Sequence, residues 1–377
     1  MGNEIIKVYS LFGKHPIYES IIKYPPKGIY FIHAPSAKEF ERLSIYTPSR
    51  MEIKNFVLNL IYSIKIPRIF FVPVSGYDLI HSSRGFLILN KKRWVVDFEH
   101  IGSFGAFSSE RVKRISLKFL GSKYCKKILP HSIAAMNSFL NGWNINEQTI
   151  LQKLEVLYPA IKARKIRRRK KQEVKIGFLA TRGAFYEKGG RELLEAFKIL
   201  NKKYDNISLI MKVKPPPEVL KFSQTNVSFV ASHFNTREEL FRKFYEELDI
   251  FVLPTYVDSF GFSLLEAMSC GIPIIATNIF AIPEIVEDGK NGFLISSPIS
   301  DFRKNFVPNF FDRDWLKMHP INLVINQLVE KLSLLIEDSS LRRKMGRYGR
   351  RLVEKGKFSI KERNKKLKKI YEEALRF

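Results

Sequence analysis

Short apolar runs alternate with helical patterns along the whole 377-residue chain, and this alternation most limits the possible folds. Strands that alternate with helices form parallel sheets covered by helices. Because single cores rarely grow past about 250–300 residues, the length predicts two domains. With 45% hydrophobic and 13% aromatic residues, the chain can fill both cores, which excludes a wholly disordered protein.

The predicted elements fall into two groups. In the first group, the pattern predicts strands at 29–32, 69–73, 94–98 and 126–130, and helices at 51–64 and 108–120. In the second, it predicts strands at 174–180, 207–213, 250–254 and 273–277, and helices at 190–204, 237–248 and 263–270. An aromatic tract at 298–320 is expected to pack on the second domain. Charged helices at 321–337 and 339–377, broken near Gly356, close the chain.

A basic run at 162–171 separates the two groups. Like charges this dense repel one another and are typical of a solvated linker, with a nucleic-acid contact as the alternative. The run contains no aromatic residue and no nucleic-acid motif accompanies it, so no nucleic-acid partner is expected. We therefore predict an α/β protein with domains at 1–163 and 172–360 and a ligand cleft between them.

The charge and the cysteines limit the partners and the compartment. The net charge of +27 predicts an anionic partner, surface or substrate. Cys125 and Cys270 are too few for a disulfide scaffold or a Cys-based zinc cluster and fit a reducing compartment. Neither a signal peptide nor an apolar run of about 18 residues is visible, so we expect a soluble protein that at most binds a membrane surface.

The segment 258–271 is the most informative part of the chain. It follows the predicted strand 250–254, so Asp258 begins a loop at a strand's carboxyl end, where doubly wound domains bind ligands. In one interpretation it is only a capped helix, because Ser263 and Glu266 have the spacing of a capping box.

In the other interpretation the same segment is a binding site. The amides at a helix N-terminus favour phosphate, and Gly261 lets the backbone approach a ligand closely. The carboxylates of Asp258 and Glu266 would then hold hydroxyls of a sugar nucleotide.

The residues of this segment and those after it resemble the signature of family 4 retaining glycosyltransferases. The matching stretches are 258–271, 274–277, 282–286 and 289–294. The family pattern has two glutamates separated by seven residues, and Asp258 and Glu266 occupy these two places. Phe280 and Ala281 stand where the family often has two glycines, which is expected to narrow the donor pocket.

A second match begins the C-terminal group. The stretches 176–182 and 187–190 are similar to the family's strand ending in Arg, followed by a Lys-Gly turn. This resemblance implies that Arg182 and Lys188 clamp the donor diphosphate. Two fixed cations can offset the charge that grows on a leaving nucleoside diphosphate. In a chain this basic, a solvated surface charge is the alternative for each of them.

The resemblance is weaker before residue 120. His33, His100 and His131 each follow an apolar strand, and a structural role is the alternative for each. The stretch 94–100 fits best the family's strand that delivers a histidine to the transferred sugar, so His100 is the preferred candidate. His131 falls where the family usually has a serine that starts a helix. Gly13 is expected in the glycine-containing loop after the first strand.

The resemblance implies a GT-B fold: two Rossmann-like, doubly wound domains facing a central cleft, with the last helix, at 361–377, packing back on the N-terminal domain. It implies a retaining hexosyltransferase that uses a nucleoside-diphosphate sugar and a glycan or lipid-linked acceptor. Asp258 would hold the sugar ring and Glu266 the ribose hydroxyls. The amides of Phe262, Ser263 and Leu264 would contact the diphosphate. A cytoplasmic location is expected, with an anionic inner membrane face as a further partner.

No metal and no other cofactor is expected. Asp312 and Asp314 have the spacing of the metal motif of the other large glycosyltransferase fold, but no apolar strand leads into them, so we interpret them as surface charge. Residues 51–68 are a candidate membrane face, and a core helix at 51–64 is the alternative. A binding protein that has lost turnover through Asp258 and the Phe280-Ala281 pair is the alternative function.

Overall fold

The computed structural model describes residues 5–13, 15–32, 65–164, 173–181, 184–220, 226–230, 234, 236–309 and 314–376. His33, Arg182, the predicted helix at 51–64 and residues 165–171 of the basic run lie outside them. The chain divides into two compact units. Unit 1 comprises Met1–Ala160, Arg303–Pro308 and Ile360–Phe377, and unit 2 comprises Ile161–Phe302 and Asn309–Ser359.

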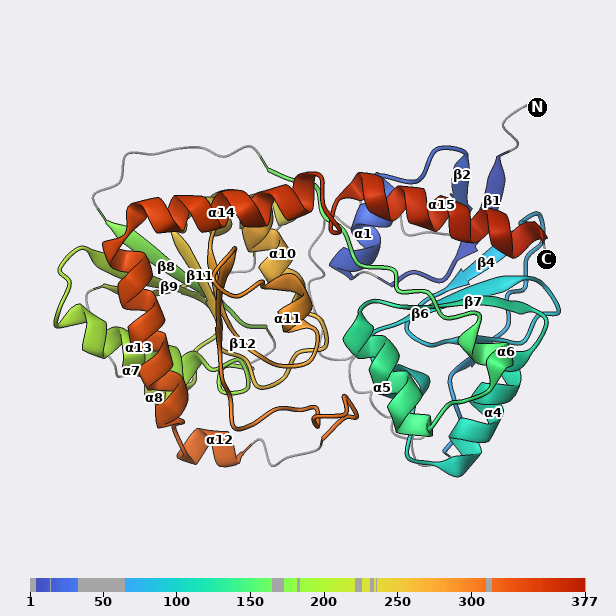
Figure 1. The fold of residues 1–377 in the computed structure, drawn as a ribbon, viewed down its shortest axis with the longest axis horizontal. Helices are drawn as coiled ribbons and strands as arrows, with labels where there is room; N and C mark the ends of the chain where they lie inside the picture. Colours follow the sequence, from blue (N-terminus) through green and yellow to red (C-terminus); the bar gives the residue numbers. More distant parts are fainter. Residues whose placement is uncertain are drawn as a thin grey trace. The chain divides into compact units, whose positions relative to one another are not determined.

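Unit 1 is built on a parallel five-stranded sheet in the order β2-β1-β4-β6-β7 (Figure 1). Its strands are β1 (Ile6–Ser10), β2 (Ile29–Ile32), β4 (Leu79–Ser82), β6 (Trp94–Phe98) and β7 (Cys125–Pro130). The short strands β3 (Ile69–Phe70) and β5 (Leu87–Ile88) form a separate parallel pair. The strand order reverses between β1 and β4, which is the topological switch point of a doubly wound sheet.

Helices cover the sheet of unit 1. They are α1 (Pro16–Lys23), the 3-10 helix η1 (Ile101–Phe104), α4 (Glu110–Gly121), α5 (Ile133–Trp143), α6 (Gln148–Leu151) and α15 (Ile360–Arg376). The last helix is polar overall, yet it buries Arg363 and Tyr371 against the rest of the unit. The Arg363 guanidinium donates to the carbonyl oxygen of Ser20 at 3.0 Å, and the Tyr371 hydroxyl lies 2.6 Å from Nδ1 of His81. These contacts fix α15 on unit 1.

Unit 2 is built on a parallel six-stranded sheet in the order β10-β9-β8-β11-β12-β13. Its strands are β8 (Val174–Leu179), β9 (Ile207–Lys212), β10 (Val227–Phe229), β11 (Ile250–Leu253), β12 (Ile274–Thr277) and β13 (Gly292–Ile295). In chain order this is the 3-2-1-4-5-6 arrangement of the Rossmann fold, and the order reverses between β8 and β11. A ligand site is therefore expected at the carboxyl ends of these two strands.

Helices lie on both faces of this second sheet (Figure 1). They are α7 (Gly190–Asn201), α8 (Pro217–Leu220), α9 (Arg237–Lys243), the 3-10 helix η2 (Tyr245–Glu247), α10 (Phe262–Ser269), α11 (Ile282–Ile285), α12 (Trp315–Met318), α13 (Asn322–Glu337) and α14 (Ser339–Glu354). The core joins the fully buried strand residues Ile176, Leu209 and Val252 to Phe197 of α7 and Leu328 of α13.

Several predictions from the sequence need correction. The predicted helix at 237–248 is divided into α9 and η2, because Phe244 leaves the helical conformation. Residues 303–308 of the aromatic tract belong to unit 1, where the Asn141 side chain donates to the carbonyl oxygen of Asn305 at 2.8 Å. Arg164, within the basic run, is held by the carboxylates of Glu238 and Glu246. This part of the run is therefore docked on unit 2.

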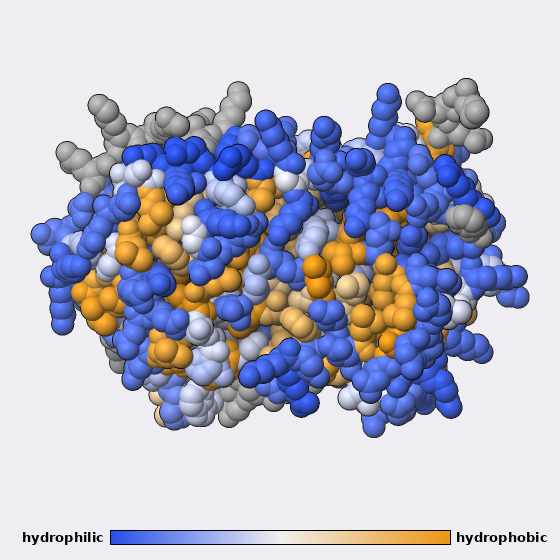
Figure 2. All heavy atoms as spheres, viewed as in Figure 1, coloured by the Kyte–Doolittle hydropathy of each residue, from blue (hydrophilic) through white to orange (hydrophobic). Residues whose placement is uncertain are grey.

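The outer faces of α14 and α15 are strongly hydrophilic (Figure 2). Their Lys and Arg side chains contribute to the net charge of +27. Among the described helices, none is both long enough and apolar enough to cross a membrane.

Candidate active site

The loops that follow β8 and β11 meet at the switch point of the unit 2 sheet. The amide of Tyr256 donates to the carbonyl oxygen of Glu187 at 2.8 Å, and the Thr255 hydroxyl donates to the same oxygen at 3.3 Å. Because β8 and β11 are neighbours in the sheet, these bonds join the two loops into one framework. The framework carries Lys188 from one loop and Asp258 from the other.

Lys188 and Asp258 form an ion pair in this framework. Nζ of Lys188 lies 2.7 Å from Oδ2 of Asp258 and donates to the carbonyl oxygen of Val257 at 2.6 Å. The side chains are 21% and 16% exposed, so both face solvent in part. Oδ1 of Asp258 accepts from the amide of Phe260 at 3.1 Å. An ammonium group has three protons, so one donor of Lys188 remains for a ligand beyond these two bonds.

Gly189 allows the close approach of the two loops. Its φ is +74°, and a Cβ placed on it would lie 2.1 Å from the carbonyl oxygen of Pro254. Only glycine combines this left-handed backbone with so little space. The residue therefore places the preceding Lys188 beside the loop after β11.

The helix α10 begins differently from the prediction. It starts at Phe262, with Gly261 at the N-cap in a left-handed conformation (φ +85°) and no side-chain cap. The predicted capping box is therefore wrong: Ser263 lies inside the helix, where its hydroxyl cannot serve as the N-cap. The amide of Leu264 donates to the carbonyl oxygen of Gly261 at 2.9 Å, so this one of the three predicted phosphate-binding amides is already engaged.

Glu266 is buried and bound by two residues that the sequence analysis did not identify. Oε2 accepts from the Tyr245 hydroxyl at 2.6 Å, and Oε1 is paired with the guanidinium of Arg237. Burial, followed by the charge of Glu266, raises the pKa of Tyr245 well above its usual value, so the hydroxyl stays a donor. A carboxylate has about four acceptor positions, so Glu266 keeps capacity for ligand hydroxyls.

Phe280 takes a backbone conformation that favours glycine. Its φ is +41°, and its ring stacks on Phe302 with the centroids 3.7 Å apart and the planes at 17°. Ala281 is fully buried beside it. Phe280 thus has the positive φ that is usual for glycine, at a position where the family signature often has glycine. Its aromatic ring occupies space that a glycine would leave open.

In unit 1, His100 follows β6 and caps the 3-10 helix η1. Its Nδ1 accepts from the amide of Gly102 at 3.1 Å. Burial lowers the pKa of His100 from its usual value, which favours the neutral imidazole. With Nδ1 accepting, we assign the remaining proton to Nε2. His100 is therefore a neutral donor at the carboxyl end of a strand.

His131 belongs to a buried network that has a structural role. Its Nε2 lies 3.3 Å from Oδ1 of Asp97, which also accepts from the Tyr18 hydroxyl at 2.7 Å, and His81 lies 3.2 Å from Oδ2. The serine that caps the following helix is Ser132, whose hydroxyl accepts from the amide of Ala135 at 2.9 Å. Asp97 lies within β6, and no local pattern distinguished it.

The histidines keep Asp97 ionised despite its burial. Burial raises the pKa of Asp97, yet its interactions with His131 and then His81 outweigh this and hold it well below its usual value. Burial lowers the pKa of His131, and Asp97 outweighs that effect and raises it overall. The pair is therefore stabilised in its charged form.

Gly13 lies in the loop after β1. The switch point of the sheet lies between this loop and the loop after β4. A Cβ on Gly13 would lie 3.7 Å from Nη1 of Arg84, which is ordinary contact. Arg84 follows β4 and is exposed, and its amide donates to Oδ1 of Asp97 at 3.1 Å. The structure thus places Gly13 and His100 at the same carboxyl edge of the unit 1 sheet.

Within the described residues, no group of three or more His, Cys, Asp or Glu side chains could hold a metal ion. Asp314 is 81% exposed and pairs with Lys317 at 2.6 Å. Asp312 lies outside the described part of the chain.

Part of the chain is similar to a known protein family and to a curated relative. Residues 161–305 match the family described as Glycosyl transferases group 1. The capsular polysaccharide biosynthesis glycosyltransferase CapM of Staphylococcus aureus is 27% identical over 196 residues, which cover 50% of this chain and 44% of CapM. The match therefore spans less than half the length of that relative.

Two solved structures match nearly the whole chain. A glycosyltransferase from Rickettsia africae aligns with a TM-score of 0.60 at 16% identity, over 99% of both chains. HepE of Anabaena, in complex with UDP and glucose, aligns with a TM-score of 0.57 at 13% identity, over 98% of this chain and all of HepE. These likenesses confirm the predicted GT-B fold. Through residues 161–305, the chain is similar to the group 1 glycosyl transferases.

Proposed function

We propose that the protein is a family 4 retaining glycosyltransferase. It moves a hexosyl unit from a nucleoside-diphosphate sugar to a hydroxyl of a glycan or lipid-linked glycan, without a metal ion. The observation that carries this proposal is the Lys188–Asp258 pair at the carboxyl ends of β8 and β11. It joins a cation suited to a phosphate with a carboxylate suited to sugar hydroxyls at the switch point of a Rossmann-type sheet.

Lys188 and Arg182 stabilise the leaving diphosphate in this proposal. Negative charge grows on the nucleoside diphosphate as the bond to the sugar breaks, and preorganised cations lower the barrier most where charge develops. Lys188 is preorganised by its bonds to Asp258 and Val257. The amides of Phe262 and Ser263, at the first turn of α10, lie at the helix end that favours phosphate.

The two carboxylates hold the two sugars of the donor. Asp258 accepts from hydroxyls of the transferred hexose, and Glu266 accepts from the ribose. Arg237 and Tyr245 fix the Glu266 carboxylate in one orientation, so little rotamer freedom is lost when the ribose binds. Gly261 brings backbone rather than a side chain to the ligand.

On the acceptor side, His100 and Gly13 contribute from unit 1. The neutral imidazole offers the Nε2 proton to a hydroxyl of the transferred sugar. No residue is assigned as a protein nucleophile. The acceptor attacks from the face that the diphosphate leaves, and the departing phosphate helps to remove the acceptor proton.

The relatives support the donor and acceptor classes. CapM is named for capsular polysaccharide biosynthesis, and HepE was solved with UDP-glucose. We further propose a cytoplasmic location with peripheral contact to an anionic inner membrane face, which the net charge of +27 favours.

A donor screen tests the proposal. The melting temperature of the purified protein is measured with UDP-, GDP-, ADP- or dTDP-sugars. In a separate assay, release of the nucleoside diphosphate is measured in excess chelator. We expect one nucleotide class to raise the melting temperature by mass action, with release continuing under chelator.

Two outcomes would contradict this proposal. Binding without any turnover would favour a non-catalytic sugar-nucleotide-binding protein, an alternative that the Phe280–Phe302 stack supports. Loss of activity under chelator that magnesium restores would contradict metal independence.

A further inference from the structure

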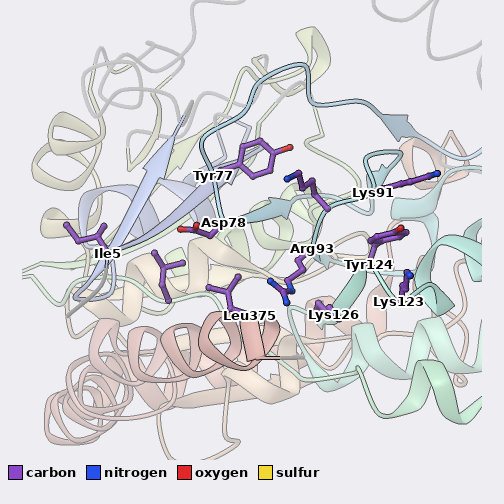
Figure 3. Close-up of a pocket in the computed structure, with 11 residues that line it drawn as sticks. Ile5, Tyr77, Asp78, Lys91, Arg93, Lys123, Tyr124, Lys126 and Leu375 are labelled. Carbon is purple, nitrogen blue, oxygen red and sulfur yellow. The ribbon is translucent and has the colours of Figure 1, made fainter. Parts of the chain in front are cut away.

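Unit 1 contains a pocket of about 670 Å³ at the amino ends of its strands. The residues before β4, β6 and β7 line it, together with the starts of β1 and β7 and the end of α15. They include Tyr77, Lys91, Arg93, Lys123, Tyr124 and Lys126 (Figure 3). Because all strands of this sheet are parallel, this edge lies opposite the carboxyl edge that carries Gly13 and His100. The pocket is therefore separate from the proposed active site of this unit.

The pocket is strongly basic. Lys91, Lys92, Arg93, Lys123 and Lys126 line it, and the acidic residue among its lining is Asp78. Oδ2 of Asp78 already accepts from the backbone amide of Lys7 at 2.7 Å. In the described part of the chain, the first four of these cations form no ion pair with a carboxylate. An excess of positive charge thus faces the cavity.

The cations are close enough to repel one another. Burial lowers the pKa of Lys126, and the charges of Arg93 and Lys123 lower it further. Nζ of Lys123 is also held 5.6 Å from the centre of the Tyr124 ring. Bound negative charge would relieve this repulsion, as it does where several Lys and Arg side chains surround one anion.

The pocket also has apolar and aromatic walls. Ile5, Ile6 and Leu375 line one side, and Tyr77 packs against Tyr9 with the ring centres 5.6 Å apart. A volume of about 670 Å³ lies in the range of small-molecule sites, which extends from about 300 to 1,000 Å³. A single small anion would leave most of this space and several of the cations without contact.

We propose that this pocket binds a ligand that carries two or more phosphate groups. Its phosphate oxygens contact Lys91, Arg93 and Lys123, and the carbon part of the ligand packs on Tyr77 and Tyr124. Two sources have this chemistry: a soluble polyphosphate compound and the phosphate-rich headgroup of a membrane lipid. The site is independent of the donor site proposed in unit 2.

Calorimetric titration with tripolyphosphate tests the site. The variant Lys91→Gln/Arg93→Gln/Lys123→Gln removes three cations from the pocket. The control Arg111→Gln/Arg114→Gln/Lys118→Gln removes three exposed cations from α4 of the same unit. We expect saturable binding that the pocket variant weakens by about tenfold or more and the control by less than about twofold. Near-native melting temperatures of both variants show that they are folded.

Cosedimentation with vesicles distinguishes the two sources. Vesicles of phosphatidylcholine are compared with vesicles that also contain phosphatidylinositol bisphosphate. Stronger binding of the latter that depends on the pocket cations identifies the lipid source, while binding of tripolyphosphate alone identifies a soluble ligand. Equal weakening of binding by the pocket and control variants, or binding of neither probe, would overturn the proposal. Transfer activity is not needed for any of these measurements, so failure of the site and failure of the proposed function are distinguishable.

Discussion

Nζ of Lys188 lies 2.7 Å from Oδ2 of Asp258, across 70 positions of sequence. The family resemblance implied separate contacts for the two residues, the lysine with the diphosphate and the aspartate with the sugar. The ion pair means that each also orients the other. A change to either residue is therefore expected to affect both donor contacts.

Lys188→Ala is expected to lower the transfer rate by about tenfold or more, because the leaving diphosphate loses a preorganised cation. Asp258 would lose its partner, at a cost of about 1–2 kcal/mol in unfolding free energy. Lys198→Ala is the matched control, since Lys198 is similarly exposed and pairs at 2.7 Å with Glu195, which lies on α7 like Lys198 itself. Initial-rate assays and urea unfolding measure both effects. Equal rates for the two variants would contradict the role of Lys188.

Asp258→Glu restores the residue that is usual in the family signature. We expect near-native or higher transfer, because the added methylene extends the carboxylate past Lys188 toward the sugar. Asp258→Asn keeps the size and removes the charge, and we expect it to lose about tenfold or more in rate. Donor affinity and turnover are measured for both variants. A collapse of transfer in Asp258→Glu with donor affinity unchanged would show that this loop is tuned to the shorter side chain.

Glu266→Gln is expected to raise the donor KM by about tenfold, since a carboxylate accepts ribose hydroxyls more strongly than an amide does. The variant also removes the negative charge that pairs with the Arg237 guanidinium in a mostly buried site. Tyr245→Phe removes one hydrogen bond but leaves the carboxylate, so it should cost about 1 kcal/mol of unfolding free energy with little change in KM. If Glu266→Gln keeps the native KM, the ribose contact is wrong.

Many of the strands were predictable because their signals are local, although no range was predicted for β4, β10 or β13. The run at 29–32 is apolar and the run at 94–98 is apolar except for Asp97, and β2 and β6 have the predicted bounds. Gly271, with its positive φ, follows the end of α10. The GT-B fold followed from the resemblance, whose motifs lie in loops at strand ends.

The site contacts were less predictable because they join distant segments. The partner of Glu266 is Arg237, 29 positions away, and nothing near Arg237 indicates a buried ion pair. The capping box failed for a backbone reason: Gly261 adopts a left-handed conformation and starts the helix one residue before Ser263. Local spacing could not distinguish these two starts.

Gly189→Ala is expected to abolish most activity and lower the melting temperature sharply. Its Cβ would lie 2.1 Å from the backbone oxygen of Pro254, which would separate the two site loops. Gly289→Ala is a matched control, because Gly289 has nearly the same φ, +72°, with nothing within 4 Å of the added Cβ. The control should lower the unfolding free energy by only about 1–2 kcal/mol, which is the cost of alanine in a left-handed conformation. Similar losses in both variants would contradict the close approach at Gly189.

The last prediction concerns the buried Asp97–His131 pair of unit 1. The pKa of Asp97 is lowered in the folded protein, so its contribution to stability is present above its usual value of 3.8 and is lost as the pH falls below it. The pKa of His131 is raised, so its contribution is fully present below its usual value of 6.5 and is lost as the pH rises through the folded value. The pair therefore stabilises the protein most between these two values.

Asp97→Asn should lower the unfolding free energy by about 3 kcal/mol near pH 6, because it leaves buried histidines without their anion. It should also remove the loss of stability that the native protein shows as the pH rises above 6.5. His131→Gln gives a second measurement: it removes the titrating group while Asp97 keeps its bond from the Tyr18 hydroxyl. Urea unfolding of the three proteins between pH 5.5 and 8.5 provides the comparison. A native profile that rises with pH, or a fall that persists in both variants, would show that this pair does not control the pH dependence.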